Sequence, residues 1–440
     1  MKSGHILGIA LQTAFAVVVV VASDPETVAR REREQQQLLE RDDLVSDEFI
    51  RGEDGQHDAR TVDGSSTVGA ANLSTTDGES VAHSEAWTHE PVCTEFLGEL
   101  DSPLCVYTNS SFSEGRGISI FTTPKIADEI ASLLPFQDAA ALSSRGINVA
   151  TDTWYTKEIP GKGMGMMAKH DLQRGELLTV YTPFLLAHTE NILNTTEREK
   201  YLQIGLSQLP KQSQEQYRAL AKIYHLPEVV VQDVVKANSF EMHLGGQMHL
   251  AVFPESSRLN HACAPNAQYY LDPDLLTHVV HAVRPIAKDE EITISYTTPY
   301  EPFSVRQKYL EKAFHFTCSC SRCQEGAATD SGLVEIHNLQ ESLGNWGADS
   351  TASVKKAERL VKVYEQEGLD AFLDNAYGHA ALMYNSVGSI RGAQKYARLA
   401  AEAASLKQGP DSSDVKFWLE LVENPQEHSS WKRRKVDREL

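Results

Sequence analysis

The chain has 440 residues, of which 41% are hydrophobic and 23% are charged, and its formal net charge is -20. This length exceeds that of a usual single domain and predicts two or three compact units. The acidic balance argues against direct nucleic-acid binding, because affinity for phosphates is built from lysine and arginine contacts. A basic protein surface is a better match, although a solvated acidic segment without a partner is the commoner meaning of such charge.

Residues 1–23 have the pattern of a secretory signal peptide. Lys2 precedes an apolar run from Ile6 to Ala22, which ends in small residues. The run is slightly long for the apolar part of a signal peptide and slightly short for a membrane span, so an uncleaved anchor is the alternative. Cleavage would leave no membrane span in the mature chain and would place it in the secretory pathway or outside the cell.

An acidic region follows at residues 24–90, with 17 Asp or Glu against 6 Arg and no Lys. It has little periodic apolar pattern and is predicted to be disordered. The flanking region 91–145 contains Cys93 and Cys105. In a secreted chain these two residues could form a disulfide, and two unpaired buried thiols are the alternative.

Short alternating runs bounded by turn residues predict β-strands on both sides of a helical segment. These strands are expected at residues 148–150, 154–158, 177–181, 248–253, 268–271, 278–282 and 291–296. Two or three helices are predicted over 196–237, and a helix over 302–313 leads into a cysteine cluster.

The C-terminal part has a different pattern, that of successive amphipathic helices. They are predicted at residues 333–345, 352–366, 369–384, 389–406 and 412–423. Paired helices of this length resemble tetratricopeptide-type repeats, without a clean repeat signature, so we expect an all-α, TPR-like region over 330–425 that offers a surface to protein partners. The tail 426–440 is basic and is either a nuclear signal or simply solvated.

The most specific motif is the segment from Asn260 to Asn266, which reads Asn-His-Ala-Cys-Ala-Pro-Asn. The glycine turn Gly161 to Gly165 is weak by itself, because glycines allow a ligand to approach the backbone but also connect strands in many proteins. Three motifs accompany the Asn-His segment: Lys162-Gly163-Met164-Gly165 of this glycine turn upstream, Asp289 to Tyr296 downstream, and Cys318, Cys320 and Cys323 after that. In this order the four motifs resemble those of SET-domain protein lysine methyltransferases. Asn238-Ser239-Phe240 and the cysteine arrangement resemble the SMYD type of this family.

The resemblance implies an α+β fold. A SET-type β fold of short strands is expected over 146–300, split by a helical insert at about 185–237 and followed by a post-SET cysteine segment at 301–325. The implied activity is S-adenosylmethionine-dependent methyl transfer to lysine side chains of histones or other proteins, and the implied alternative location is the nucleus or cytoplasm. A catalytically silent scaffold that binds protein partners is the alternative function.

The resemblance also assigns roles to individual residues. Tyr296 would be catalytic, with its hydroxyl near the reacting methyl group, and Phe240 and Phe314 would line the substrate channel. Cofactor binding would fall to Lys162, Gly163, Met164, Gly165, Asn238, Asn260, His261, Tyr296 and Phe316. Aromatic walls suit this chemistry, since lysine must lose a proton before it can attack and an apolar channel lowers the pKa of its ammonium group.

Four cysteines resemble the structural zinc site of the family: Cys263, Cys318, Cys320 and Cys323. Four sulfur ligands would leave no open coordination position, so this zinc would be structural rather than catalytic. In an oxidising lumen, disulfides would compete with zinc for the same thiols.

The chain departs from the family pattern in two places. The insert between Tyr181 and Asn238 contains no cysteine, so the MYND zinc finger is absent from it. Phe314 stands where many members carry a channel tyrosine, which removes one hydroxyl dipole from the channel and is expected to affect the number of methyl groups added or the activity.

Overall fold

The structure is a computed structural model and describes residues 86–434. The signal-like segment 1–23, almost all of the acidic region and the end of the basic tail therefore lie outside the described residues. Between residues 86 and 434, none of the helices combines the length and the apolar character needed to cross a membrane.

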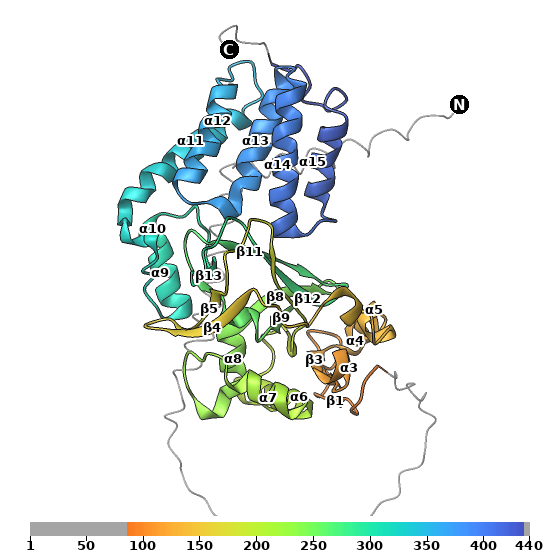
Figure 1. Cartoon of the computed structure of the whole chain (residues 1–440). Helices are drawn as coiled ribbons and strands as arrows, with labels where there is room; N and C mark the ends of the chain where they lie inside the picture. The colour runs from red at the N-terminus through yellow and green to blue at the C-terminus, as the bar shows by residue number, and fades with distance from the viewer. Residues whose placement is uncertain (1–85, 435–440) are drawn as a thin grey trace, which may run out of the picture.

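Three β-sheets form the lower part of the molecule in Figure 1, and the C-terminal helices form the upper part. The largest sheet has six strands in the order β1-β2-β3-β7-β9-β8. Their bounds are β1 Val92–Cys93, β2 Cys105–Asn109, β3 Ile118–Thr122, β7 Leu185–His188, β9 Gln247–Val252 and β8 Ser239–Leu244. The flanking region 91–145 thus contributes three strands to the sheet that carries both ends of the insert, and also holds the short helices α3 Phe112–Gly115, α4 Pro124–Ala131 and α5 Leu134–Gln137.

Cys93 and Cys105 lie directly opposite each other in β1 and β2 and form a disulfide. Sheet pairing also joins distant parts of the chain here, since β3 and β7 run parallel, with Ser119 beside Leu185. A parallel pair requires a long connection, and the chain between these strands supplies it.

The second sheet has the order β10-β13-β5-β4, and the third has the order β11-β12-β6. The strands are β10 Asn260–His261, β13 Glu291–Ile294, β5 Gly163–Ala168, β4 Trp154–Ile159, β11 Ala267–Asp272, β12 Thr277–Ala282 and β6 Leu177–Tyr181. Gly161 connects β4 to β5 with a φ of 76°, a conformation that glycine adopts without a steric penalty.

The strand predicted at 148–150 is wrong, because the structure places these residues in a loop. Asn148 has a φ of 64°, which ends any extended conformation. Its side-chain oxygen accepts a hydrogen bond of 2.8 Å from the backbone nitrogen of Thr182, so the residue fastens the loop to the chain after β6.

The helices of the insert lie at the bottom of Figure 1. They begin at Thr195 and not at about residue 185, because Leu185–His188 forms a buried strand of the six-stranded sheet. They are α6 Thr195–Gln208, α7 Lys211–Arg218 and α8 Val230–Asn238. Glu199 of α6 is buried and accepts hydrogen bonds from the backbone nitrogens of Val231 and Gln232 at 2.9 and 3.0 Å. A carboxylate at the first turn of α8 satisfies donors that have no partner within the helix and complements its dipole.

The predicted all-helical C-terminal region is confirmed. After α9 Phe303–Phe314 and α10 Ser321–Gln324 come α11 Asp330–Gly344, α12 Val354–Gln366, α13 Leu373–Ser386, α14 Ile390–Gln408 and α15 Ser413–Glu423. Small residues such as Ala380 and Ala397 are fully buried between these helices and allow them to pack closely. Each helix packs mainly on its neighbours in sequence, and α14 also contacts β11. A TPR-like repeat character stays a prediction.

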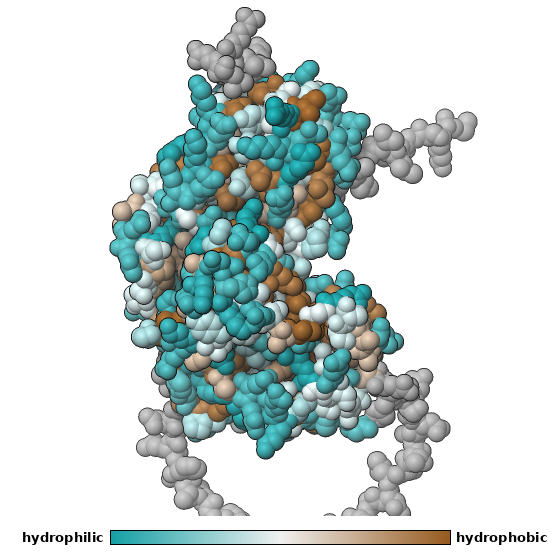
Figure 2. Space-filling model, viewed as in Figure 1, coloured by the Kyte–Doolittle hydropathy of each residue, from teal (hydrophilic) through white to brown (hydrophobic). Residues whose placement is uncertain are grey.

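The face of the molecule shown in Figure 2 is mostly hydrophilic. Hydrophobic residues gather in the notch between the C-terminal helices and the lobe that carries α4 and α5.

Candidate active site

The second sheet brings three of the four motifs together. Asn260 and His261 of β10 lie beside Thr293 and Ile294 of β13, in parallel pairing. The other side of β13 pairs with β5, which carries the glycine motif. Segments that are far apart in the sequence therefore meet around one short strand.

Tyr296 follows β13 and is held at both ends. Its backbone nitrogen donates to Nδ1 of His261 at 2.9 Å, and its hydroxyl donates to the carbonyl oxygen of Leu259 at 2.5 Å. Burial, followed by the charges of Glu291 and Tyr269, raises the pKa of Tyr296 well above its ordinary value. The phenol is therefore neutral at physiological pH, and its lone pairs stay available because its proton is directed to Leu259.

The geometry also assigns the tautomer of His261. A backbone N–H can only donate, so Nδ1 of this ring accepts and the ring proton lies on Nε2. Burial lowers the pKa of His261 to about 4, which keeps the ring neutral. Nε2 lies 3.2 Å from Sγ of Cys263, so a single imidazole connects Tyr296 to the cysteine cluster.

Glu291 is a site residue that the sequence did not single out, although it lies within the acidic motif. Its two carboxylate oxygens accept from Nδ2 of Asn260 at 2.9 Å and from Nζ of Lys162 at 2.7 Å. Gly165 lies against the same amide, since a Cβ at this position would come within 3.0 Å of Nδ2 of Asn260. Three of the predicted cofactor residues thus form one connected group, whereas Gly163 and Met164 are exposed on β5.

Aromatic rings surround Tyr296 on the side of the cysteine segment. The ring of Phe314 lies 5.0 Å from that of Tyr296, and the ring of Phe316 lies 6.1 Å from that of His261. These contacts put Phe314, from the end of α9, beside the tyrosine, and Phe316, from the segment after α9, beside the histidine that holds the tyrosine.

Phe240 belongs to a second aromatic group. Its ring lies 5.2 Å from Tyr269 and 4.2 Å from His278, two residues that the sequence analysis missed. Phe240, Tyr269 and Tyr296 all pack against the same buried core, which joins this group to the catalytic candidate. Only their position in the third sheet reveals the two missed residues, because β11 and β12 carry no motif.

Asn238 ends α8, and its side-chain nitrogen donates to the carbonyl oxygens of Ala221 and Val234 at 2.9 and 2.7 Å. These bonds give the amide nitrogen a local structural role. Cofactor binding by Asn238 therefore stays a prediction.

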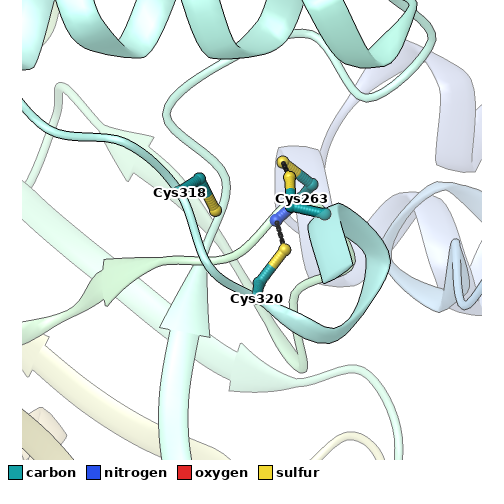
Figure 3. A group of neighbouring side chains, drawn as sticks. Cys263, Cys318 and Cys320 are labelled. Atoms are coloured by element: carbon teal, nitrogen blue, oxygen red, sulfur yellow. Dashed lines mark hydrogen bonds between the residues drawn. The ribbon is translucent and has the colours of Figure 1, made fainter. Parts of the chain in front are cut away.

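The four predicted cysteines converge, as Figure 3 shows for three of them. All four sulfur atoms lie within 4.8 Å of one another. Sγ of Cys263 lies 3.4 Å from Sγ of Cys323, and Sγ of Cys320 accepts from the backbone nitrogen of Cys263 at 3.4 Å. Tetrahedral zinc with bonds of about 2.3 Å separates its sulfur ligands by roughly 3.8 Å, so the donor set and its spacing fit a closed zinc site.

Residues 163–297 match the sequence family described as "SET domain". The chain carries a SET domain. It includes the glycine motif, the Asn-His motif and Tyr296, the residues that the second sheet brings together.

Relatives of this SET domain include proteins named as histone-lysine methyltransferases. The chain is 26% identical to "Histone-lysine N-methyltransferase set5" of Schizosaccharomyces pombe, over 63% of this chain and 86% of that protein. It is 37% identical to "Histone-lysine N-methyltransferase ASHR1" of Arabidopsis thaliana, over 21% of this chain and 18% of that protein. A similar match, 37% identity over 23% of each chain, is to "SET domain-containing protein SmydA-8, isoform A" of Drosophila melanogaster. The chain spans less than a quarter of the length of the last two.

Proposed function

We propose that the protein is an S-adenosylmethionine-dependent methyltransferase that acts on lysine side chains of proteins. The observation that carries the proposal is the placement of Tyr296, whose hydroxyl is directed by Leu259 and whose backbone is held by His261. The SET domain and its relatives named as histone-lysine methyltransferases support the same activity.

The bound donor would supply a methyl group already activated on a sulfonium, so the protein needs to bind, align and exclude water rather than provide a strong base. Asn260 and the glycine strand β5 would hold the donor, with Glu291 positioning the amide of Asn260. The donor's adenine would lie towards His261 and Phe316, whose rings are 6.1 Å apart.

Tyr296 would act on the methyl group through its oxygen. Because the hydroxyl hydrogen is donated to Leu259, the lone pairs of the oxygen would face the partially positive methyl carbon. This preorganised dipole would stabilise the transition state more than the bound donor. The neighbouring rings, including Phe314, would remove water from the lysine amine and favour its uncharged form.

The four cysteines would hold a structural zinc that fixes the segment after α9 against the Asn-His motif. The zinc site would also help to position Tyr296, because His261 contacts both Cys263 and the tyrosine. The proposal also includes a SMYD-like relation, a partner-binding role for the C-terminal helices and a secretory location.

Calorimetric titration of S-adenosylmethionine into the full chain tests the proposal. Asn260→Ala should weaken binding about ten- to a hundredfold, because it removes a polar ligand group and its bond to Glu291. Tyr296→Phe should keep binding but lose methyl transfer to purified core histones and to a lysine-peptide library, read by mass spectrometry.

Tyr181→Phe is the matched control, since this buried tyrosine also donates its hydroxyl to a backbone carbonyl, that of Val149 at 3.1 Å. It should behave as wild type in both assays. A folded, zinc-loaded wild type that does not bind the donor would exclude the enzyme and leave the scaffold alternative.

A further inference from the structure

Two buried arginines flank the cysteine cluster. Arg306 on α9 is 0% exposed and Arg322 on α10 is 4% exposed. Both come from the segment that supplies three of the four cysteines, so the same short stretch of chain brings sulfur and positive charge together.

The hydrogen bonds of these two guanidinium groups are incomplete. Nη1 of Arg306 donates to the carbonyl oxygen of Glu301, and Nη1 of Arg322 donates to that of Pro299 at 2.7 Å. Nε and Nη2 of both side chains have no hydrogen-bond partner within residues 86–434. Within residues 86–434, the ion-pair partner of these guanidinium groups is Glu367, with an oxygen 3.7 Å from Nε of Arg322.

A buried charge is strongly destabilising unless an opposite charge lies close to it. A single carboxylate paired with Arg322 does not balance two guanidinium groups, and Nη1 of Arg322 also donates to the carbonyl oxygen of Cys263 at 3.4 Å, so this charge lies against the cysteine cluster. The helix that carries Arg306 is fixed to the same cluster, because the side chain of the next residue, Gln307, exchanges hydrogen bonds of 2.8 and 2.9 Å with the backbone of Cys318. The cysteine cluster is therefore the place where the missing negative charge belongs.

The chemical state of the sulfurs decides whether that charge is present. A zinc ion with four thiolates carries two negative charges, which match two arginines, whereas two disulfides carry none. Disulfide formation can compete with zinc binding in this chain, because the chain also contains the Cys93–Cys105 disulfide.

We propose that Arg306 and Arg322 are the counter-ions of a dianionic zinc-tetrathiolate and favour this state over disulfide formation among the same cysteines. This role is independent of methyl transfer, so the two proposals fail separately. It also connects the cluster to the helical region, because Glu367, which follows α12, lies beside Arg322.

Zinc affinity, measured in the full chain by competition with a chromophoric chelator, tests the proposal. Arg306→Gln and Arg322→Gln should each weaken zinc binding about ten- to a hundredfold, the usual effect of removing a group that supports metal ligands. Arg306→Lys and Arg322→Lys keep the charge and should lose less. Wild-type affinity in folded glutamine variants would overturn the proposal.

Arg116→Gln is the matched control. Arg116 is also largely buried and pairs with Glu255 at 2.7 Å, outside the cysteine cluster. Its loss should reduce stability and leave zinc affinity unchanged, so a general effect of removing a buried arginine is separated from a local one.

A second measurement uses the wild type and does not depend on how the variants fold. Zinc-loaded protein is kept in a glutathione buffer at the redox poise of the secretory lumen, and its zinc and thiols are counted by mass spectrometry. Retained zinc with Cys93–Cys105 as the disulfide supports the proposal. Zinc loss with disulfides among the four clustered cysteines overturns it.

Discussion

Gly165 offers a direct test of how the glycine strand supports the site. A Cβ added at this residue would lie 2.3 Å from Cδ1 of Ile159 and 3.0 Å from Nδ2 of Asn260. The end of the half-buried isoleucine side chain can rotate away. The amide cannot yield as easily, because Glu291 holds it at 2.9 Å.

The expected magnitude follows from that hydrogen bond. A bond to a charged acceptor contributes about 1.5–3 kcal/mol, and each 1.4 kcal/mol corresponds to a factor of ten in an equilibrium constant. Gly165→Ala should therefore weaken S-adenosylmethionine binding about ten- to a hundredfold. Folding stability should change less, because Asn260 and Glu291 are only half-buried and both groups can bond to water once their hydrogen bond is broken.

Calorimetric titration of the donor, with chemical unfolding of the same preparations, separates these effects. Gly175→Ala is the control, since Gly175 has a φ of 85°, has nothing within 4 Å of an added Cβ and lies outside the glycine turn. Its left-handed backbone should cost about 1–2 kcal/mol of stability and leave donor binding unchanged. Wild-type donor affinity in Gly165→Ala would refute the proposed role of the Asn260 amide.

Three further outcomes are expected. Replacing Cys93 and Cys105 by serine opens a loop with a sequence separation of 12 and should lower the free energy of unfolding by about 3 kcal/mol in urea, and an unchanged value would contradict this. Burial lowers the pKa of His249 to about 4 and that of His278 to about 3, so both rings are uncharged in the folded protein. The free energy of unfolding should therefore be highest above pH 6.5 and should fall below this pH, by about 2 kcal/mol per histidine at pH 5. Equal free energies of unfolding in urea at pH 7.5 and pH 5 would contradict this prediction. Phe314→Tyr places a hydroxyl beside Tyr296, 5.0 Å away between rings, and should reduce the highest methylation state seen by mass spectrometry, whereas an identical product distribution would speak against a channel role.

The sequence predicted the elements and residues whose signals are local. Helices α11 to α15 follow from an apolar repeat within each segment, and the structure begins and ends them close to the predicted residues. The Asn-His motif and the cysteine segment identified the SET domain because their residue types and spacing are specific. Local pattern was insufficient at Asn148, where one left-handed residue replaces the predicted strand.

Tertiary structure alone decided how those segments meet. The parallel pairing of β10 with β13 brings Asn260 near Glu291, and β11 places Tyr269 beside Phe240. No local pattern encodes such contacts, since strand pairing joins residues that are distant in the chain and depends on the whole hydrophobic core. The tautomer of His261 likewise follows from a single backbone donor, which exists only once the strands are paired.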